Sequence, residues 1–264
     1  MSVPAVSNIS VYPIKSCAGI ALSHAWVNDI GLSFDRRFVV SDDKGRFITG
    51  RTETSLCLVQ VHLTDAGLVL TAPEMPPLRI EYAQLSSDTQ DVTVWQDRIQ
   101  AQRCHESADH WFSQYLRRPC HLLFFGVQSS RTVAECDTPL AFADSHPLLL
   151  ISQGSLDDLN RRLPHAVSMS HFRPNIVVKN CEPFAEDQWR HIRVGDVAFE
   201  LSGPCSRCIF TTVDPKTGCK HPQQEPLATL KGYRRSVTGS VLFGQNVIPL
   251  NAGPITLGDE VVVV

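Results

Sequence analysis

The 264-residue chain centres on the stretch Val197-Ala198-Phe199-Glu200-Leu201-Ser202-Gly203-Pro204-Cys205-Ser206-Arg207-Cys208-Ile209-Phe210-Thr211-Thr212-Val213-Asp214-Pro215. Its first five residues resemble a strand, and Ser202-Gly203-Pro204 predicts a break after them. Cys205 and Cys208 follow, and the β-prone residues beyond them end at the turn signal Asp214-Pro215. We therefore expect two thiols at a bend between two strands, where their side chains can face a ligand.

The two thiols allow several interpretations. Arg207 lies between them, and positive charge favours the thiolate, which is the form that binds a metal or attacks an electrophile. A structural zinc site needs four ligands, and no second Cys-x-x-Cys is present, although Cys219 and His221 leave a Cys3His site open. A thioredoxin-like redox pair would begin a helix, whereas β-prone residues follow here. Two incidental buried cysteines are a further interpretation, which Arg207 and the Gly-Pro bend disfavour.

Composition indicates an ordinary globular protein of one large or two small domains, with 43% hydrophobic and 19% charged residues. A net charge of −3 argues against general nucleic-acid or membrane-surface binding, but not against a local basic pocket. No apolar run approaches the ~20 residues of a membrane helix, and no secretion signal is visible. Nine scattered cysteines without an export signal predict reduced thiols and a cytoplasmic location.

The expected secondary structure is mainly β. Many short strands in the first 100 residues are typical of a barrel or sandwich. Helices are predicted at 107–117 with Ser107 as the N-cap, and from Ser155 to Leu163, where Ser155-Leu156-Asp157-Asp158 has the form of a capping box. A last helix is predicted near residues 227–235. The fold class that follows is mainly β (α+β).

Basic residues at the expected strand edges indicate an anionic ligand. In Tyr12-Pro13-Ile14-Lys15-Ser16-Cys17-Ala18-Gly19, an ammonium, a hydroxyl and backbone N–H groups could meet a phosphate, without the spacing of a P-loop. Arg36 and Arg173 each come just before an apolar strand, where a guanidinium suits phosphate recognition. Each residue alone could equally be an exposed charge. Together, in an acidic protein, they predict an anion beside the thiols.

The run Asp144-Ser145-His146 contains the residue types of a serine hydrolase triad. Three successive residues cannot converge as the members of a triad do, and no Gly-x-Ser-x-Gly elbow is present. The sequence therefore disfavours a hydrolase.

Taken in order, these segments resemble the MOSC family, the molybdenum cofactor sulfurase C-terminal domain, preceded by its partner N-terminal β-barrel domain. Bacterial YcbX-type proteins and the mitochondrial amidoxime-reducing component belong to this group. The segments that carry the resemblance are Tyr12-Pro13-Ile14-Lys15-Ser16-Cys17, Asp35-Arg36, Ser155-Leu156-x-Asp158-Leu159-Asn160, Phe172-Arg173-Pro174-Asn175-Ile176-Val177, Cys205-Ser206-Arg207-Cys208-Ile209-x-Thr211-Thr212-Val213-Asp214-Pro215 and Leu242-Phe243-Gly244-Gln245. The resemblance implies an N-terminal β-barrel-like domain at residues 1–120 and a MOSC β-barrel domain with a few helices at residues 121–264.

The resemblance also implies roles for individual residues. The second cysteine of the motif is the family's protein ligand to molybdenum, which implies Cys208 as the metal ligand and catalytic residue. The family's Lys-Ser pair and two arginines bind the pterin phosphate and nearby atoms, and they match Lys15, Ser16, Arg36 and Arg173. The other residues assigned to the molybdenum cofactor (molybdopterin) pocket are Asp144, Ser145, Asn175, Ser206, Arg207 and Asn246. Cys205 is then a packed neighbour, and His146 stands where the family varies.

The implied activity is the reduction of small N-hydroxylated compounds, such as amidoximes, hydroxylamines and N-hydroxylated bases, by two electrons that pass through molybdenum. No cysteine run has the spacing of a plant-type iron–sulfur cluster, so we expect a separate flavoprotein or iron–sulfur protein to donate electrons. One alternative is a carrier of the cofactor, or of persulfide sulfur on Cys208. Another is a phosphate- or nucleotide-binding module without redox activity.

Overall fold

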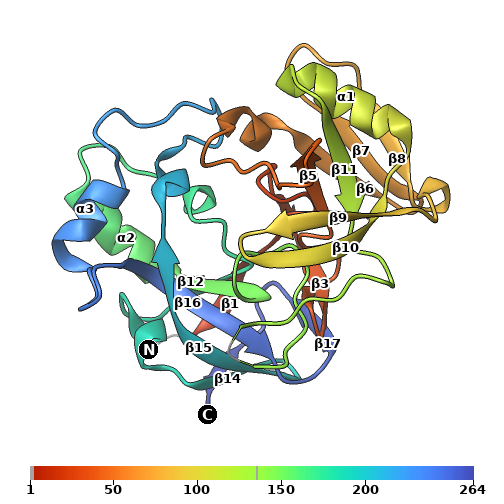
Figure 1. The fold of residues 1–264 in the computed structure, drawn as a ribbon. Coiled ribbons are helices and arrows are strands. Elements are labelled where there is room, and N and C mark those ends of the chain that lie inside the picture. Colours follow the sequence, from red (N-terminus) through yellow and green to blue (C-terminus); the bar gives the residue numbers. More distant parts are fainter. Residues whose placement is uncertain (1–2, 135) are drawn as a thin grey trace.

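The computed structural model describes residues 3–134 and 136–264, which form eighteen strands and three α-helices (Figure 1). The prediction of a mainly β fold is therefore confirmed. In that part of the chain, no helix combines the length and the apolar character needed to span a membrane.

The largest sheet combines strands from both ends of the chain. Its eight strands lie in the order β18-β14-β15-β16-β12-β13-β1-β2. Their bounds are β1 Ala5–Val11, β2 Ile20–Leu22, β12 Leu148–Ser152, β13 Ile176–Lys179, β14 His191–Val194, β15 Val197–Arg207, β16 Val241–Pro249 and β18 Val261–Val263. Neighbouring strands are antiparallel except β12 and β13, which run parallel. One face of this sheet contributes to a hydrophobic core around Ile9, Val178 and Phe199.

Three smaller sheets complete the β structure. One has the order β5-β11-β10-β9, and the others are β17-β3-β4 and β6-β7-β8. Their bounds are β3 His24–Asn28, β4 Gly31–Leu32, β5 Phe38–Asp42, β6 Gln60–Thr64, β7 Gly67–Thr71, β8 Leu78–Glu81, β9 Thr89–Val94, β10 Asp97–Arg103, β11 Cys120–Phe124 and β17 Gly253–Thr256. Helix α1 Glu106–Leu116 packs Trp111 and Phe112 into a second core beside these sheets (Figure 1).

The sheets join the two predicted domains. Strand β1 pairs with β13 through Ile9 and Ile176, and β3 pairs with β17. The loops that follow β1 and β4 therefore lie next to loops from the C-terminal half of the chain. The domain division at residue 120 stays a prediction. The predicted cofactor site does not depend on this division, because its residues come from both sides of residue 120.

The central strand differs from the prediction. Ser202-Gly203-Pro204 does not end it: β15 continues to Arg207, with register shifts against β16 on either side of Gly203 and Pro204. The extra residues of such bulges bend a strand without ending its pairing. After Cys208 the chain forms a 3₁₀ turn, η5 (Ile209–Thr212), and not the second strand that was expected.

The three predicted helices are present, but two caps are shifted. His105, and not Ser107, caps α1, because its side chain accepts a hydrogen bond from the Ser107 N–H. Ser152 caps α2 (Gln153–Arg162), so Ser155 is the third residue inside the helix and not its start. Helix α3 spans Leu227–Tyr233, close to the predicted range.

Gly244 in the middle of β16 provides a test of this packing. Its φ is +78°, and an added Cβ would lie 2.5 Å from Ile151 Cγ1 and 2.8 Å from the Leu150 carbonyl oxygen. We expect Gly244→Ala to lower the free energy of unfolding by about 2–4 kcal/mol, as the sum of backbone strain and crowding. Urea denaturation measures this loss.

Gly258 offers a matched control for the crowding part. Its φ is +92°, but an added Cβ would meet nothing within 4 Å. Gly258→Ala should therefore cost only the backbone strain, about 1–2 kcal/mol. Equal losses for the two variants would show that the contact of Gly244 with β12 is unimportant.

Candidate functional site

Cys208 is fixed at the junction of strand β15 and the turn η5. Its carbonyl oxygen accepts hydrogen bonds from Thr211 N, at 3.1 Å, and from Thr211 Oγ1, at 2.9 Å. Cys205 lies three residues earlier on β15, where its Sγ accepts a hydrogen bond from Arg207 NH1 at 3.0 Å. Both thiols are half-buried and line one cavity. The guanidinium that was expected between the thiols is therefore bonded to Cys205.

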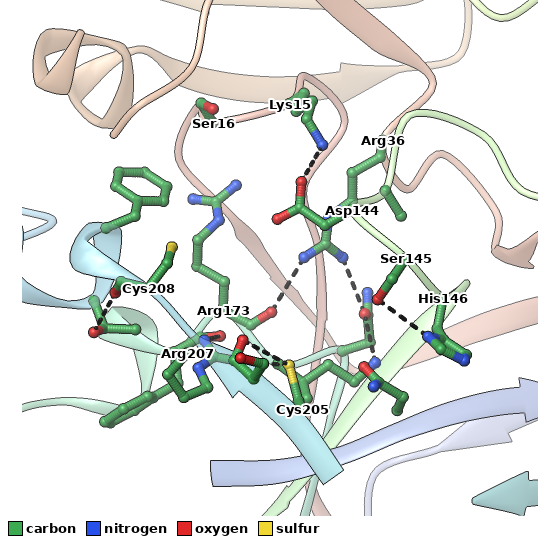
Figure 2. A pocket seen from close by; sticks show the side chains of 18 of the residues that line it. Lys15, Ser16, Arg36, Asp144, Ser145, His146, Arg173, Cys205, Arg207 and Cys208 are labelled. Atoms are coloured by element: carbon green, nitrogen blue, oxygen red, sulfur yellow. Dashed lines mark hydrogen bonds and ion pairs between the residues drawn. The ribbon is translucent and has the colours of Figure 1, made fainter. Parts of the chain in front are cut away.

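The cavity has a volume of about 530 Å³ and gathers residues from distant parts of the chain. Figure 2 shows basic side chains from several elements pointing into the space in front of Cys208. The structure brings together every residue predicted for the site: Lys15, Ser16, Arg36, Asp144, Ser145, Arg173, Asn175, Ser206, Arg207, Cys208 and Asn246. Their individual roles stay predictions.

Two of the predicted cations already have carboxylate partners. Lys15 Nζ lies 2.6 Å from Asp144 Oδ1 and donates to the Phe142 carbonyl at 2.7 Å. Arg36 NH1 lies 2.6 Å from Asp35 Oδ2, and the Asp35 side chain is fully buried. Both charges are therefore balanced within the protein, which weakens their claim to be the main phosphate ligands.

Burial lowers the pKa of Lys15, and Asp144 acts in the opposite direction. At Asp144 the loss of water against the cavity wall acts to raise the pKa. The Lys15 ammonium and the hydrogen bonds of Asp144 outweigh this effect and hold its pKa well below the usual range. Asp144 is therefore an ionised carboxylate at neutral pH.

Arg173 and Arg207 contribute uncompensated positive charge to the cavity. Among the described residues, neither has a carboxylate within ion-pair distance, and both are half-buried. Arg173 NH1 donates to the Cys17 carbonyl and Arg207 NH2 to the Phe172 carbonyl, each at 2.7 Å. Within the part of the chain that the structure describes, the buried Arg207 Nε has no hydrogen-bond partner. Guanidinium groups left in this state suit a bound phosphate, so the donor set of this cavity fits the phosphate of a pterin cofactor.

Tyr12 holds two of the guanidinium groups, those of Arg36 and Arg173, in place. Arg36 and Arg173 lie over the ring of Tyr12, at 4.3 Å and 4.1 Å from its centroid. Such contacts position a guanidinium without neutralising it. Arg173, Arg36 and Ser16 also have positive φ values of 57°, 45° and 71°. Left-handed backbone at three residues of one cavity is a form of strain that proteins tend to retain at binding sites.

Asn175 is a buried residue whose hydrogen bonds fix the neighbouring Arg36. Its Oδ1 accepts from Arg36 NH1 at 2.9 Å and from Leu149 N at 3.2 Å, while its Nδ2 donates to the Ser10 carbonyl at 3.1 Å. With these three bonds and only 1% exposure, Asn175 orients Arg36. Ser206 and Ser145 are exposed at the cavity wall.

The last residue of the predicted set is Asn246, which lines the cavity. Asn246 Nδ2 donates to the Pro204 carbonyl at 3.5 Å, which places it beside the thiol-bearing strand. His146 also lines the cavity, with its Nδ1 3.1 Å from Ser145 Oγ.

The structure adds residues to the cavity that sequence reasoning missed. Arg51 and Trp95 both line the cavity. The Arg51 guanidinium stacks on the Trp95 ring, with its carbon 4.1 Å from the ring centroid. Trp95 Nε1 also donates to Asp144 Oδ1 at 3.1 Å. With Arg51 included, the cavity lining within residues 3–134 and 136–264 has five cationic residues and a single carboxylate, Asp144. The signal available in the sequence was the polar turn Thr49-Gly50-Arg51-Thr52, which is weak by itself.

The zinc interpretation receives no support from the arrangement of side chains. Across residues 3–134 and 136–264, no three His, Cys, Asp or Glu side chains gather in a way that could hold a metal ion. Cys219 is exposed, and its Sγ donates to the Thr217 carbonyl within its own turn. Any metal at Cys208 would therefore need most of its ligands from a cofactor.

The Lys15–Asp144 pair predicts a pH dependence of stability. The pKa of Asp144 lies below the unfolded value of about 3.9, so the pair stabilises the fold above about pH 4. This contribution is lost as pH falls through the folded pKa. Because the Asp144 side chain is 61% exposed, we expect the contribution to be on the order of 1 kcal/mol or less. Urea unfolding of the wild type and Asp144→Asn across a pH series measures it.

The difference in unfolding free energy between wild type and Asp144→Asn should be constant above about pH 5 and shrink below about pH 4. A difference that stayed constant in acid would show that Asp144 is protonated together with the unfolded chain, and that Lys15 does not hold it ionised.

The fold and the cavity define a β-rich protein with a pocket that is lined by cationic side chains and presents a cysteine thiol. The MOSC N-terminal beta barrel domain matches residues 3–119, and the MOSC domain matches residues 137–262. Mitochondrial amidoxime-reducing component 1 of Mus musculus is 34% identical, over 97% of this chain and 81% of its own length. Mitochondrial amidoxime reducing component 2 of Rattus norvegicus is 36% identical, over 97% of this chain and 82% of its own.

The chain belongs to the MOSC family and combines an N-terminal MOSC β-barrel domain with a MOSC domain. The two relatives match it over nearly its whole length. Among solved structures, the YUAD protein of Bacillus subtilis covers 98% of this chain and 94% of its own, with a TM-score of 0.43 and 11% identity. That likeness is too distant to bear on function.

Proposed function

We propose that the protein binds a molybdenum cofactor and reduces small N-hydroxylated compounds with electrons from a separate donor protein. The observation that carries the proposal is the cavity that combines the Cys208 thiol with the guanidinium groups of Arg173 and Arg207, which have no carboxylate partner among the described residues. Membership in the MOSC family, and relatives named as amidoxime-reducing components, support this choice of cofactor and substrate class.

Different residues of the protein would bind the metal and the phosphate of the cofactor. Cys208 would supply a soft sulfur ligand to molybdenum, which suits a thiolate. Arg173, Arg207 and the Ser16 hydroxyl would bind the phosphate by charge-assisted hydrogen bonds. When bound, the cofactor supplies the two-electron chemistry, while the protein orients it and sets its surroundings.

The overall reaction is balanced by two electrons and two protons. The N–O bond of the substrate breaks, the nitrogen is left as an amine or amidine, and the oxygen leaves as water. The electrons come from a separate flavoprotein or iron–sulfur protein. On the protein side, ionised Asp144 can accept hydrogen bonds from the N–H and O–H groups of a substrate at the cavity wall.

Metal analysis combined with a reduction assay tests the proposal. The protein is produced in a host that makes the cofactor, its molybdenum content is measured, and the conversion of benzamidoxime to benzamidine is followed with a competent electron donor. We expect about one molybdenum per chain, together with turnover.

Molybdenum or persulfide sulfur without turnover would favour a carrier. A phosphate ligand without metal would favour a binding module that has no redox activity.

A further inference from the structure

We infer that Trp95 and Arg51 form a partly exposed stacking rim on the wall of the cavity that selects planar, aromatic N-hydroxylated substrates. This inference rests on the proposed function and adds a specificity-determining feature to it. It concerns residues that lie outside the motifs of the sequence analysis.

The backbone at Trp95 indicates that its ring has a purpose beyond the turn. Trp95 and Gln96 form the two-residue tip between β9 and β10, since Val94 pairs with Asp97. Trp95 has a φ of +58°, at the turn position that usually carries glycine. Bulky residues rarely adopt this conformation. A tryptophan held there despite its backbone strain indicates a role for the side chain.

The surroundings of the ring hold it at the cavity wall beside Asp144. Its edge meets Phe47, with ring centroids 4.8 Å apart at an angle of 71°. Arg51 lies over the ring at 4.1 Å, and the indole N–H donates to Asp144 Oδ1 at 3.1 Å. Even with these three contacts Trp95 is 39% exposed. A fixed, partly exposed aromatic surface therefore stands beside an ionised carboxylate.

This combination matches an amidoxime attached to an aromatic ring. The amidoxime group is planar, and its O–H and N–H₂ groups are hydrogen-bond donors that the Asp144 carboxylate can accept. The attached ring can stack against the Trp95–Arg51 pair, since aromatic and guanidinium surfaces both bind flat, delocalised groups. A substrate with a methyl group in place of the ring would gain the polar contacts alone.

Equilibrium binding of two amidoximes tests the rim separately from catalysis. Benzamidoxime and acetamidoxime share the reactive group and differ in the ring, and calorimetry without an electron donor measures the affinity of the cofactor-loaded protein for each. We expect the wild type to bind benzamidoxime about 10- to 100-fold more tightly. Trp95→Gly, which suits the positive φ, should reduce this preference to about threefold or less.

Two further variants complete the design. Trp95→Phe keeps an aromatic ring without the indole N–H and should keep most of the preference. Trp26→Ala removes a tryptophan that is 54% exposed on β3 and does not line the cavity, so the full preference should remain. An undiminished preference in Trp95→Gly, or none in the wild type, would overturn the inference. A ring-dependent preference without any reduction of benzamidoxime would support the rim while refuting the proposed function.

Discussion

Cys208→Ser is expected to lose reductase activity by roughly 10³-fold or more, equivalent to roughly 4 kcal/mol of transition-state stabilisation. A serine hydroxyl stays protonated at neutral pH and is a hard oxygen donor, whereas molybdenum held by a dithiolene favours a soft thiolate. The substitution is nearly isosteric, and the hydrogen bonds that Thr211 N and Thr211 Oγ1 donate to the Cys208 carbonyl do not involve the Cys208 side chain. The fold should therefore survive, and molybdenum content and turnover measure the loss directly.

Cys205→Ser provides the matched control within the same motif. Its thiol lines the same cavity and accepts a hydrogen bond from Arg207 NH1, which a serine oxygen can also accept. We expect this variant to retain its molybdenum and to lose at most a few-fold in rate. If Cys205→Ser were the more damaging change, or if Cys208→Ser matched the wild type, the assignment of the metal ligand would be wrong.

The sequence allowed the fold class to be predicted because strand and turn signals are local. The predictions of individual element boundaries were wrong where tertiary pairing outweighs a local signal. Gly203 and Pro204 predicted the end of a strand, yet pairing with β16 carries β15 through them with two register shifts. Helix α2 is capped by Ser152 and not by the predicted Ser155, because buried Glu186 accepts hydrogen bonds from Ser152 N and Ser155 Oγ. No local pattern contains that contact.

The site was predicted by family resemblance and not by spacing, because its residues run from Lys15 to Asn246 and meet only through sheet pairing. Resemblance could not show how the charges balance. Lys15 and Arg36 are neutralised by Asp144 and Asp35, which leaves the other guanidinium groups to attract an anion. The stacking of Arg51 on Trp95 was also not predicted from the sequence, since the two residues lie in separate turns.

Arg173→Ala is the second variant for which we expect a large effect, here on cofactor retention. The substitution removes a guanidinium that has no carboxylate partner among the residues described and that points into the cavity (Figure 2). A charge-assisted hydrogen bond to a phosphate contributes about 1.5–3 kcal/mol, so we expect cofactor affinity to fall about 10- to 100-fold. Molybdenum and pterin content after extended dialysis measures this loss. Raised salt should shrink the difference from the wild type, because screening weakens the contact that only the wild type makes.

Arg173 also packs on Tyr12 and bonds the Cys17 carbonyl, so its removal could loosen the loop itself. Arg173→Lys separates the two effects, because it keeps the positive charge but not the planar, bidentate fork, and should retain an intermediate amount of cofactor. Arg162→Ala removes a half-exposed guanidinium that stacks on Tyr233 outside the cavity, and should leave cofactor content unchanged. If Arg173→Ala keeps its full molybdenum and pterin through dialysis, the phosphate is held elsewhere, and Arg173 serves only to position Tyr12.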